Sequence, residues 1–500
     1  MILKYCLREV TQRDIIRENY NKRCHRKACF RLLRNGIKTV VVDFYIESLR
    51  EVILRLDRED IIDLKYWLAD PAGTPVWENK MASSSFDDML KKYKADNKVD
   101  MPNRYYDEAT SYLYFFINIA NRWKPSTETS DYVHDFNLLL QIWYQIYTAN
   151  DAELLLIGNA PHGPVPYMAY VVAKIMNLKV IITEQNYFAI DRFMCFSSLE
   201  RIGYDYLHCD LNLPNENTIP LGGFGKTPFY MAPNTPKQLL YSGRFRISAA
   251  IIALLKWKNI KYQISKNGKL FFYRVGEKLG YRAIEKYLAK RFDTHRNDFC
   301  QPFDKEKKYV YFPLHLQPEM TTDTLGGVYE DQLLALERLS KLLPDDWKIF
   351  IKENPKQTYY KRSKRFFARL SCIDKVMLVS PRTSTFDLIK DAQFIATVTG
   401  SAGWEAITAG KKVLCFGYAW YRSLAGVIAY SEELTIDDIY NYQFDDTDFK
   451  ESYRIFSKSL FPGIVAGDDF YDFNPEFSIK DNNDKVFLSL KQAILCYDER

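Results

Sequence analysis

The stretch Thr397-Val-Thr-Gly-Ser-Ala-Gly-Trp-Glu405 joins an apolar strand to a helix through small hydroxyl and glycine residues. Backbone N–H groups at the start of a helix have no intrahelical partner and lie at the positive end of the helix dipole, so this turn favours a phosphate. We expect Thr399, Gly400 and Ser401 to contact that phosphate. Glu405, placed in the first helical turn, would repel it and is better suited to the hydroxyls of a ribose. The alternative is an ordinary strand–turn–helix whose small residues serve close packing.

Two other strands end in polar residues. The alternating segment Trp347-Lys-Ile-Phe-Ile-Lys-Glu-Asn-Pro355 ends in Lys352, followed by the polar pair Glu353-Asn354 and a proline. Phe312-Pro-Leu-His-Leu-Gln-Pro-Glu319 closes another strand. Ligands of open α/β sheets bind beyond the carboxyl ends of the strands. We therefore expect Lys352 to meet the same phosphate through a charge-assisted hydrogen bond.

From Lys308 onward, strand and helix patterns alternate regularly. The predicted strands are 309–314, 348–351, 376–378, 394–398 and 413–416, and the predicted helices are 329–343, 358–370, 384–390 and 402–409. Such alternation is typical of a doubly wound, Rossmann-like domain with a parallel sheet.

The first half of the chain shows three strand patterns, at 38–44, 153–158 and 179–183, with helical apolar spacing at 167–176. The last two strands and this helix predict a βαβ unit and hence a second parallel sheet. We expect an amino-terminal Rossmann-like domain at 1–230, a linker and helical insertion at 231–305, a nucleotide-binding domain at 306–430, and a tail at 431–500 that docks back on the domains. A final helix is predicted near 486–495.

The composition, with 47% hydrophobic and 26% charged residues, is that of an ordinary globular protein of two or three domains. The net charge of +6 suits anionic substrates or membrane surfaces without requiring nucleic acid. The nine cysteines include no Cys-x-x-Cys pair and no signal peptide is recognised, which indicates a reducing, cytoplasmic compartment. No apolar run approaches the length of a membrane span, so any membrane contact would be peripheral.

Four motifs of the second half resemble the capsular polysaccharide biosynthesis family, the bacterial group of GT-B glycosyltransferases that includes the β-Kdo transferases. They are Phe312–Glu319, Lys352-Glu-Asn-Pro355, Thr397-Val-Thr-Gly-Ser401 and Gly417-Tyr-Ala-Trp-Tyr421. In the first half, Thr183-Glu-Gln-Asn-Tyr-Phe188 and Ser198-Leu-Glu-Arg-Ile-Gly203 are similar to two further elements of that family. The resemblance implies a GT-B-like α/β fold, in which two Rossmann-like domains face a cleft, and it implies that His315, Gln317 and Glu319 bind the donor. Asn354 stands where the family has histidine.

Glycosyl transfer needs a positive environment for the departing nucleotide and a carboxylate near the anomeric carbon, acting as base or nucleophile. Glu184 is the candidate carboxylate, because it follows a strand and matches the family's glutamate; the alternative is a helix N-cap or a surface charge. Glu200 and Asp191 are the other candidates. His162, in Pro161-His-Gly-Pro164, is a candidate for contact with the acceptor, or is merely an exposed turn residue.

Three further patterns do not support a site. Cys24-His-Arg-Lys-Ala-Cys29 lacks a second pair at zinc spacing. Gly222-Gly-Phe-Gly-Lys-Thr227 lacks the first glycine and the strand of a P-loop. Asp445-Asp-Thr-Asp448 is interpreted as a solvated acidic turn.

The sequence thus predicts a glycosyltransferase that needs no metal and no cofactor. The expected partners are a nucleotide-sugar donor, for which CMP-Kdo is favoured, and a surface glycan or its lipid carrier at the inner face of the membrane. The alternatives are a UDP- or GDP-sugar donor, or a catalytically silent nucleotide-binding scaffold.

Overall fold

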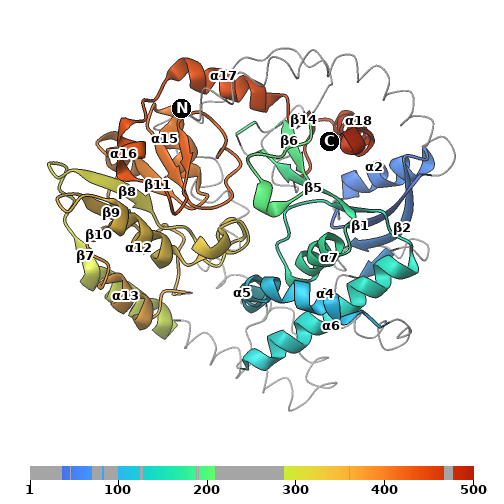
Figure 1. Ribbon diagram of the computed structural model, residues 1–500, viewed down its shortest axis with the longest axis horizontal. Coiled ribbons are helices and arrows are strands. Elements are labelled where there is room, and N and C mark those ends of the chain that lie inside the picture. Colours follow the sequence, from blue (N-terminus) through green and yellow to red (C-terminus); the bar gives the residue numbers. More distant parts are fainter. Residues whose placement is uncertain are drawn as a thin grey trace, which may run out of the picture.

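The computed structural model describes residues 36–44, 47–69, 81–83, 100–123, 128–186, 188–189, 191–208, 286–359, 361–466 and 477–499. The motifs at 24–29 and 222–227, and residues 231–285 of the expected insertion, lie outside these ranges. Residues 286–299 form a helix. The described chain folds around two seven-stranded sheets, shown on the right and left of Figure 1. The predicted fold class, α/β with two Rossmann-like domains, is confirmed.

The first sheet has the order β14-β6-β5-β4-β1-β2-β3. Its strands are β1 (Ile37–Val42), β2 (Ile62–Ala69), β3 (Met81–Ser83), β4 (Leu154–Ile157), β5 (Lys179–Gln185), β6 (Arg192–Phe196) and β14 (Leu460–Pro462). Its helices are α2 (Glu47–Arg58), α4 (Asn103–Ala109), α5 (Leu113–Trp123), α6 (Thr129–Ala149), α7 (Pro164–Ile175) and α18 (Ile479–Leu495), with short 3₁₀ turns η1 (Thr110–Tyr112), η2 (Leu199–Arg201) and η6 (Cys496–Glu499). The predicted βαβ unit is β4–α7–β5, and its strands pair in parallel.

The alternation of side chains along the central strands explains why helices cover both faces of the first sheet. Val40 and Val42 belong to the apolar cluster that α4–α7 build, whereas Val41 belongs to the cluster of α2 and α18. The carboxyl-terminal residues return to this sheet: β14 pairs antiparallel with β6, and α18 lies beside α2 in Figure 1.

Gly463 shows how closely the returning segment packs. Its φ of 124° lies in a region that residues with a side chain rarely adopt. A Cβ atom there would stand 2.5 Å from Val486 Cγ2 of α18. The backbone directly after β14 therefore requires glycine at this position.

The second sheet has the order β13-β12-β11-β8-β9-β10-β7, and its strands pair in parallel. Its strands are β7 (Cys300–Gln301), β8 (Tyr309–Pro313), β9 (Lys348–Lys352), β10 (Val376–Val379), β11 (Ile395–Thr397), β12 (Val413–Cys415) and β13 (Val427–Ala429). Its helices are α11 (Met320–Asp323), α12 (Gln332–Leu342), α13 (Lys364–Leu370), α14 (Thr385–Lys390), α15 (Ser401–Thr408), α16 (Ile436–Asn441) and α17 (Asp446–Ser457), with the 3₁₀ turn η4 (Gly327–Glu330). The strand–helix alternation predicted from Lys308 onward is confirmed.

Two local expectations differ from the structure. The acidic segment at 445–448 is not a turn outside regular structure: Asp445 caps α17, accepting from the N–H groups of Thr447 and Asp448. Glu184 does not follow its strand but lies within β5, because antiparallel pairing with β6 at Met194 extends the strand to Gln185.

Candidate functional site

The second sheet reverses its strand order between β8 and β11. From β8 the chain adds β9 and then β10 on one side, whereas β11, β12 and β13 follow on the other. A crevice for ligands forms at such a switch point, beyond the carboxyl ends of the strands. His315 follows β8, Lys352 ends β9, and Thr399–Ser401 follow β11, so three of the predicted segments meet at this edge.

His315 connects two of these segments directly. Its ring atom Nε2 lies 2.9 Å from the hydroxyl oxygen of Thr397, which also accepts from the N–H group of Gly400 at 3.2 Å. A Cβ atom on Gly400 would come within 3.0 Å of the imidazole. Burial, and to a lesser extent the positive charge of Arg362, lower the pKa of His315 to about 4. The imidazole is therefore neutral at pH 7.

Lys352 and Glu405 form the charged part of the site. The Lys352 ammonium donates to the carbonyl of Thr383 at 2.9 Å and to the hydroxyl of Thr385 at 2.5 Å. Burial lowers the pKa of Lys352, and the charge of Glu405 opposes that effect. Burial raises the pKa of Glu405 to about 7, although Ser401 and Lys352 both favour its ionised form.

Glu405 does not lie in the first turn of its helix, as expected, because α15 begins at Ser401 and places it in the second turn. There it is buried, and the Ser401 hydroxyl is 3.5 Å from its carboxylate. The Thr399 hydroxyl, expected at a phosphate, donates to the carbonyl of Thr321 at 2.6 Å. Gly400 is the N-cap and has no side chain to satisfy the first N–H groups of α15.

Gln317 and Glu319 have different surroundings. Gln317 is buried and hydrogen-bonds to the side chains of Gln332 at 2.8 Å and Arg362 at 3.1 Å. Glu319 caps α11 by accepting from the N–H group of Thr321. Asn354 uses its side-chain oxygen to accept from the N–H group of Lys356 at 2.9 Å. Such a bond organises the turn after β9.

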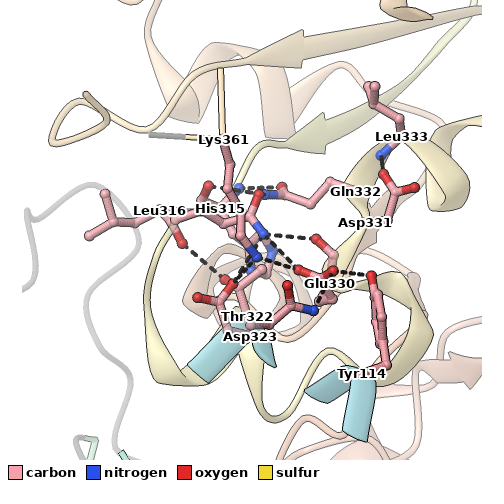
Figure 2. Close-up of polar contacts among 12 residues, drawn as sticks. Tyr114, His315, Leu316, Thr322, Asp323, Glu330, Asp331, Gln332, Leu333 and Lys361 are labelled. Atoms are coloured by element: carbon pink, nitrogen blue, oxygen red, sulfur yellow. Dashed lines mark hydrogen bonds and ion pairs between the residues drawn. The ribbon is translucent and has the colours of Figure 1, made fainter. Parts of the chain in front are cut away.

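A polar network around Glu330 joins the two domains (Figure 2). The Glu330 carboxylate accepts from Tyr114 and Asn118 of α5 in the first domain, and from the Lys361 ammonium at 2.6 Å in the second. Lys361 also donates to Asp323 at 3.2 Å, and burial raises the pKa of Asp323. These contacts bring α5 beside the segment that follows β8.

Glu184 lies in the first domain, close enough to Glu319 of the second for that charge to act on it. Its carboxylate accepts from the N–H group of Ala160, in the turn after β4, at 3.0 Å. Burial raises the pKa of Glu184 to about 8; the Ala160 bond opposes this, and the charge of Glu319 adds to it. Because the charge of Glu319 acts on Glu184, the predicted catalytic carboxylate lies near the segment that carries the predicted donor-binding residues. It is neither a helix N-cap nor a surface charge.

The other first-domain candidates have mainly internal partners. Glu200 accepts from Ser198 at 2.6 Å and Tyr170 at 2.7 Å and pairs with Lys174 at 2.9 Å. The His162 ring atom Nδ1 lies 2.7 Å from the Ala160 carbonyl. Asp191 lies at the surface beside Arg192.

Sequence reasoning missed Arg362 and Glu353, which form a buried ion pair behind His315 and Gln317. It also missed Glu330 and its partners on α5. The alternating apolar pattern of the strands predicts where they end, but a buried charge outside that pattern carries no local signal.

Within the described ranges, no group of three or more His, Cys, Asp or Glu is arranged to hold a metal ion. Among the helices described, none is long and apolar enough to cross a membrane.

Comparison with known proteins finds a family match for part of the chain. Residues 234–436 match the family model described as capsule polysaccharide biosynthesis protein, and the resemblance drawn from the motifs is confirmed for this region. A search of curated proteins finds no match.

Among solved structures, similarity is found to KpsC of Thermosulfurimonas dismutans, described as a β-Kdo 2,7-transferase, with 11% identity and a TM-score of 0.32, over 91% of this chain and 99% of that chain. A second KpsC structure from that organism, described as a β-Kdo 2,4-transferase, has 12% identity and a TM-score of 0.27, over 62% of this chain and 82% of that chain. The UDP-GlcNAc 2-epimerase of Methanocaldococcus jannaschii has 12% identity and a TM-score of 0.24, over 83% of this chain and 97% of that chain.

Proposed function

We propose, from the match of residues 234–436 to capsule polysaccharide biosynthesis proteins, that this protein is a glycosyltransferase acting on a surface polysaccharide or its lipid carrier. The observation that carries the proposal is the meeting of His315, Lys352 and the amino end of α15 at the switch point of the second sheet. The motif resemblance favours Kdo, delivered as CMP-Kdo, as the sugar transferred. The proposed place of action is the cytoplasm, at the inner face of the membrane.

In the proposed donor site, the nucleotide phosphate binds at the amino end of α15. An ammonium group has three N–H donors, and Thr383 and Thr385 account for two of those of Lys352, which leaves one for a phosphate oxygen. The N–H groups of the first turn of α15 supply further donors and the positive end of the helix dipole. Glu405 accepts from uncharged hydroxyls of the nucleotide.

The proposed chemistry takes place between the domains. Glu184 acts as base or nucleophile, with its raised pKa placing its ionisation near neutral pH. His162, in the turn after β4, contacts the acceptor. Glu200, held by three internal partners, orients the turn in which it lies.

A nucleotide screen tests the donor assignment. Thermal unfolding of the full chain is followed with CMP, UDP and GDP, and CMP is expected to raise the melting temperature most, since a ligand that binds the folded state stabilises it. Protection by UDP or GDP in its place would assign the donor to that nucleotide. Sugar transfer from the matching nucleotide sugar is then measured: protection without transfer would favour a silent scaffold, and protection by none of the three would overturn the donor site.

A further inference from the structure

Arg362 and Glu353 form an ion pair in the interior of the second domain. Their side chains are 0% and 1% exposed. Arg362 Nε donates to one carboxylate oxygen at 2.9 Å and Nη2 to the other at 3.1 Å. Glu353 directly follows β9, and Arg362 lies just before α13, so the pair ties together two segments at the edge of the sheet.

The other N–H groups of Arg362 reach the segment after β8. Nη1 donates to the side-chain oxygen of Gln317 at 3.1 Å and to the Lys361 carbonyl at 3.4 Å, and Nη2 donates to the His315 carbonyl at 3.2 Å. All five donors of the guanidinium are therefore used, and the group lies over the Phe366 ring at 4.5 Å. A lysine has neither the planar fork nor the number of donors to replace it.

The His315 backbone is held on both sides. Its N–H group donates to Gln332 at 2.7 Å, and its carbonyl accepts from Gln332 at 3.2 Å as well as from Arg362. With the backbone fixed, the ring meets Thr397 at 2.9 Å and packs tightly on Gly400, where an added Cβ would lie 3.0 Å from it. A continuous set of contacts thus leads from Glu353 through Arg362 and His315 to the amino end of α15.

We propose that Arg362, held by Glu353, is a positioning residue that fixes the His315 imidazole against Thr397 and Gly400, at the place where the donor phosphate would bind. The identity of that ligand rests on the proposed function; the placement of the ring does not. A buried ion pair is weak evidence for a role in stability alone, because apolar residues of similar volume often serve stability as well. The use of all five N–H donors of Arg362 indicates instead that this residue fixes the positions of the groups around it.

The charges around His315 support a second effect of the same residue. Arg362, from the segment before α13, is the charged group that lowers the pKa of His315 beyond the effect of burial. Glu353, at the end of β9, is paired with it, whereas Gln332 of α12, Thr397 of β11 and Gly400 before α15 are uncharged. Removing the arginine should therefore raise the pKa of His315, while burial, the larger cause, still holds it below its ordinary value.

The test replaces the pair by apolar residues, as Glu353→Leu with Arg362→Met, in the full chain. The His315 ring resonance, assigned by its loss in His315→Gln, is followed by NMR against pH, and CMP affinity is measured by calorimetry. The wild-type ring, with a pKa of about 4, should titrate below about pH 5.5, and in the double variant its pKa should be higher than in the wild type, because the positive charge of Arg362 is gone while burial remains. CMP affinity should fall about tenfold, as expected when a contact to a charged ligand loses its geometry. Arg369→Met is the matched control, since Arg369 pairs with Asp331 and Glu337 on the surface of the same domain.

A folded double variant with an unchanged His315 titration and unchanged CMP affinity would overturn the proposal. If CMP binds neither protein but the titration shifts as expected, the positioning role stands and the donor assignment fails. If the double variant does not fold, Arg362→Lys carries the test: it keeps the charge and loses the fork, so the ring should remain neutral while its chemical shift changes. An unchanged chemical shift in Arg362→Lys would also overturn the proposal.

Discussion

The pKa values of two glutamates of the first domain, Glu184 and Glu200, are shifted in opposite directions because their neighbours differ. Burial raises the pKa of Glu184 to about 8, and its one hydrogen bond, from the Ala160 N–H group, does not offset that effect. Burial also acts to raise the pKa of Glu200, but bonds from Ser198, Tyr170 and Lys174 outweigh it and hold the pKa below its usual value. Both residues were predicted as candidate carboxylates, and the difference between them arises from side chains distant in sequence, which the motif spacing does not reveal.

Glu184→Gln should leave CMP affinity intact and lower the rate of sugar transfer by orders of magnitude, because glutamine keeps the shape and removes the base or nucleophile. In the wild type, transfer should speed up as pH rises toward about 8, since the ionised carboxylate is the reactive form. Steady-state kinetics from pH 6 to 9 measure both effects. Near-normal turnover in the variant would move the role to Glu200 or Asp191.

Glu184 also makes stability depend on pH. Its pKa rises from 4.5 to about 8 on folding, so between these values the folded state holds a proton that the unfolded state has lost. Wild-type stability should therefore decline as pH rises through this window. Glutamine does not titrate, so the free energy of unfolding of Glu184→Gln should increase relative to wild type from pH 5 to 8. Urea unfolding at several pH values measures this, and a difference independent of pH would contradict it. The pKa of Glu200 is lowered in the folded state, so Glu200→Gln should show no such gain.

Lys352→Met tests the charged part of the donor site. Loss of one charge-assisted hydrogen bond should weaken CMP binding by about tenfold or more. The pKa of Glu405 should also rise above about 7, because the positive charge that favours its ionised form is gone. Calorimetry across pH 6 to 8 measures both. Lys411→Met removes a lysine that donates to the Ala392 carbonyl of the same domain and should leave affinity unchanged.

At the scale of elements, the second sheet was predictable because its strands are buried on both faces. Along β8, Tyr309 and Tyr311 pack on one side and Val310 and Phe312 on the other, so the strand is a continuous apolar run. Two of the missed strands lack this continuous apolar run. β2 alternates apolar residues with the ion pair of Asp63 and Lys65, a pattern that does indicate a strand and was overlooked. β14 has three residues, one of them proline, so that its pairing with β6 and not local periodicity decides its structure.

Gly463→Ala should destabilise the first domain by about 1–3 kcal/mol, because the new methyl group would collide with Val486 and the residue would keep a positive φ. Gly410→Ala is a matched control: Gly410 has a φ of 76°, but the nearest atom to its added Cβ is 3.9 Å away. Chemical unfolding of both variants compares them. An equal loss of stability would mean that the backbone after β14, or the Val486 side chain, adjusts to the methyl group.

At the scale of the whole molecule, the domains meet through polar and apolar contacts together. Glu330 joins α5 to the second domain, and the Tyr206 hydroxyl donates to the Trp420 carbonyl at 2.8 Å. Phe188 of the first domain lies against Trp404 and Trp420 of the second, with ring centroids 5.4 and 5.9 Å apart. The sequence predicted two domains, but the residues that join them are scattered through the chain and share no motif.

Tyr114→Phe combined with Asn118→Ala should loosen this junction. Each change removes a hydrogen bond to the Glu330 carboxylate. Such a bond contributes about 1 kcal/mol, and the Tyr114 side chain is half exposed, so water can replace part of its contact. Small-angle X-ray scattering should then show a larger radius of gyration. Tyr106→Phe, which removes a bond to Gln141 inside the first domain, should leave the radius unchanged. An unchanged radius in the double variant would show that the aromatic contacts suffice to hold the domains together.

The pairing of β14 with β6 has a consequence for synthesis on the ribosome. Strand β14 and helix α18 of the first domain are synthesised after the whole of the second sheet. Only then does β6 gain its outer partner, and α2 its neighbour α18. Until then the nascent first domain exposes the apolar face to which Phe193 and Cys195 belong. Unpaired strand edges and apolar faces attract other chains. Translation speed through the second domain thus sets how long this strand edge and this apolar face stay uncovered.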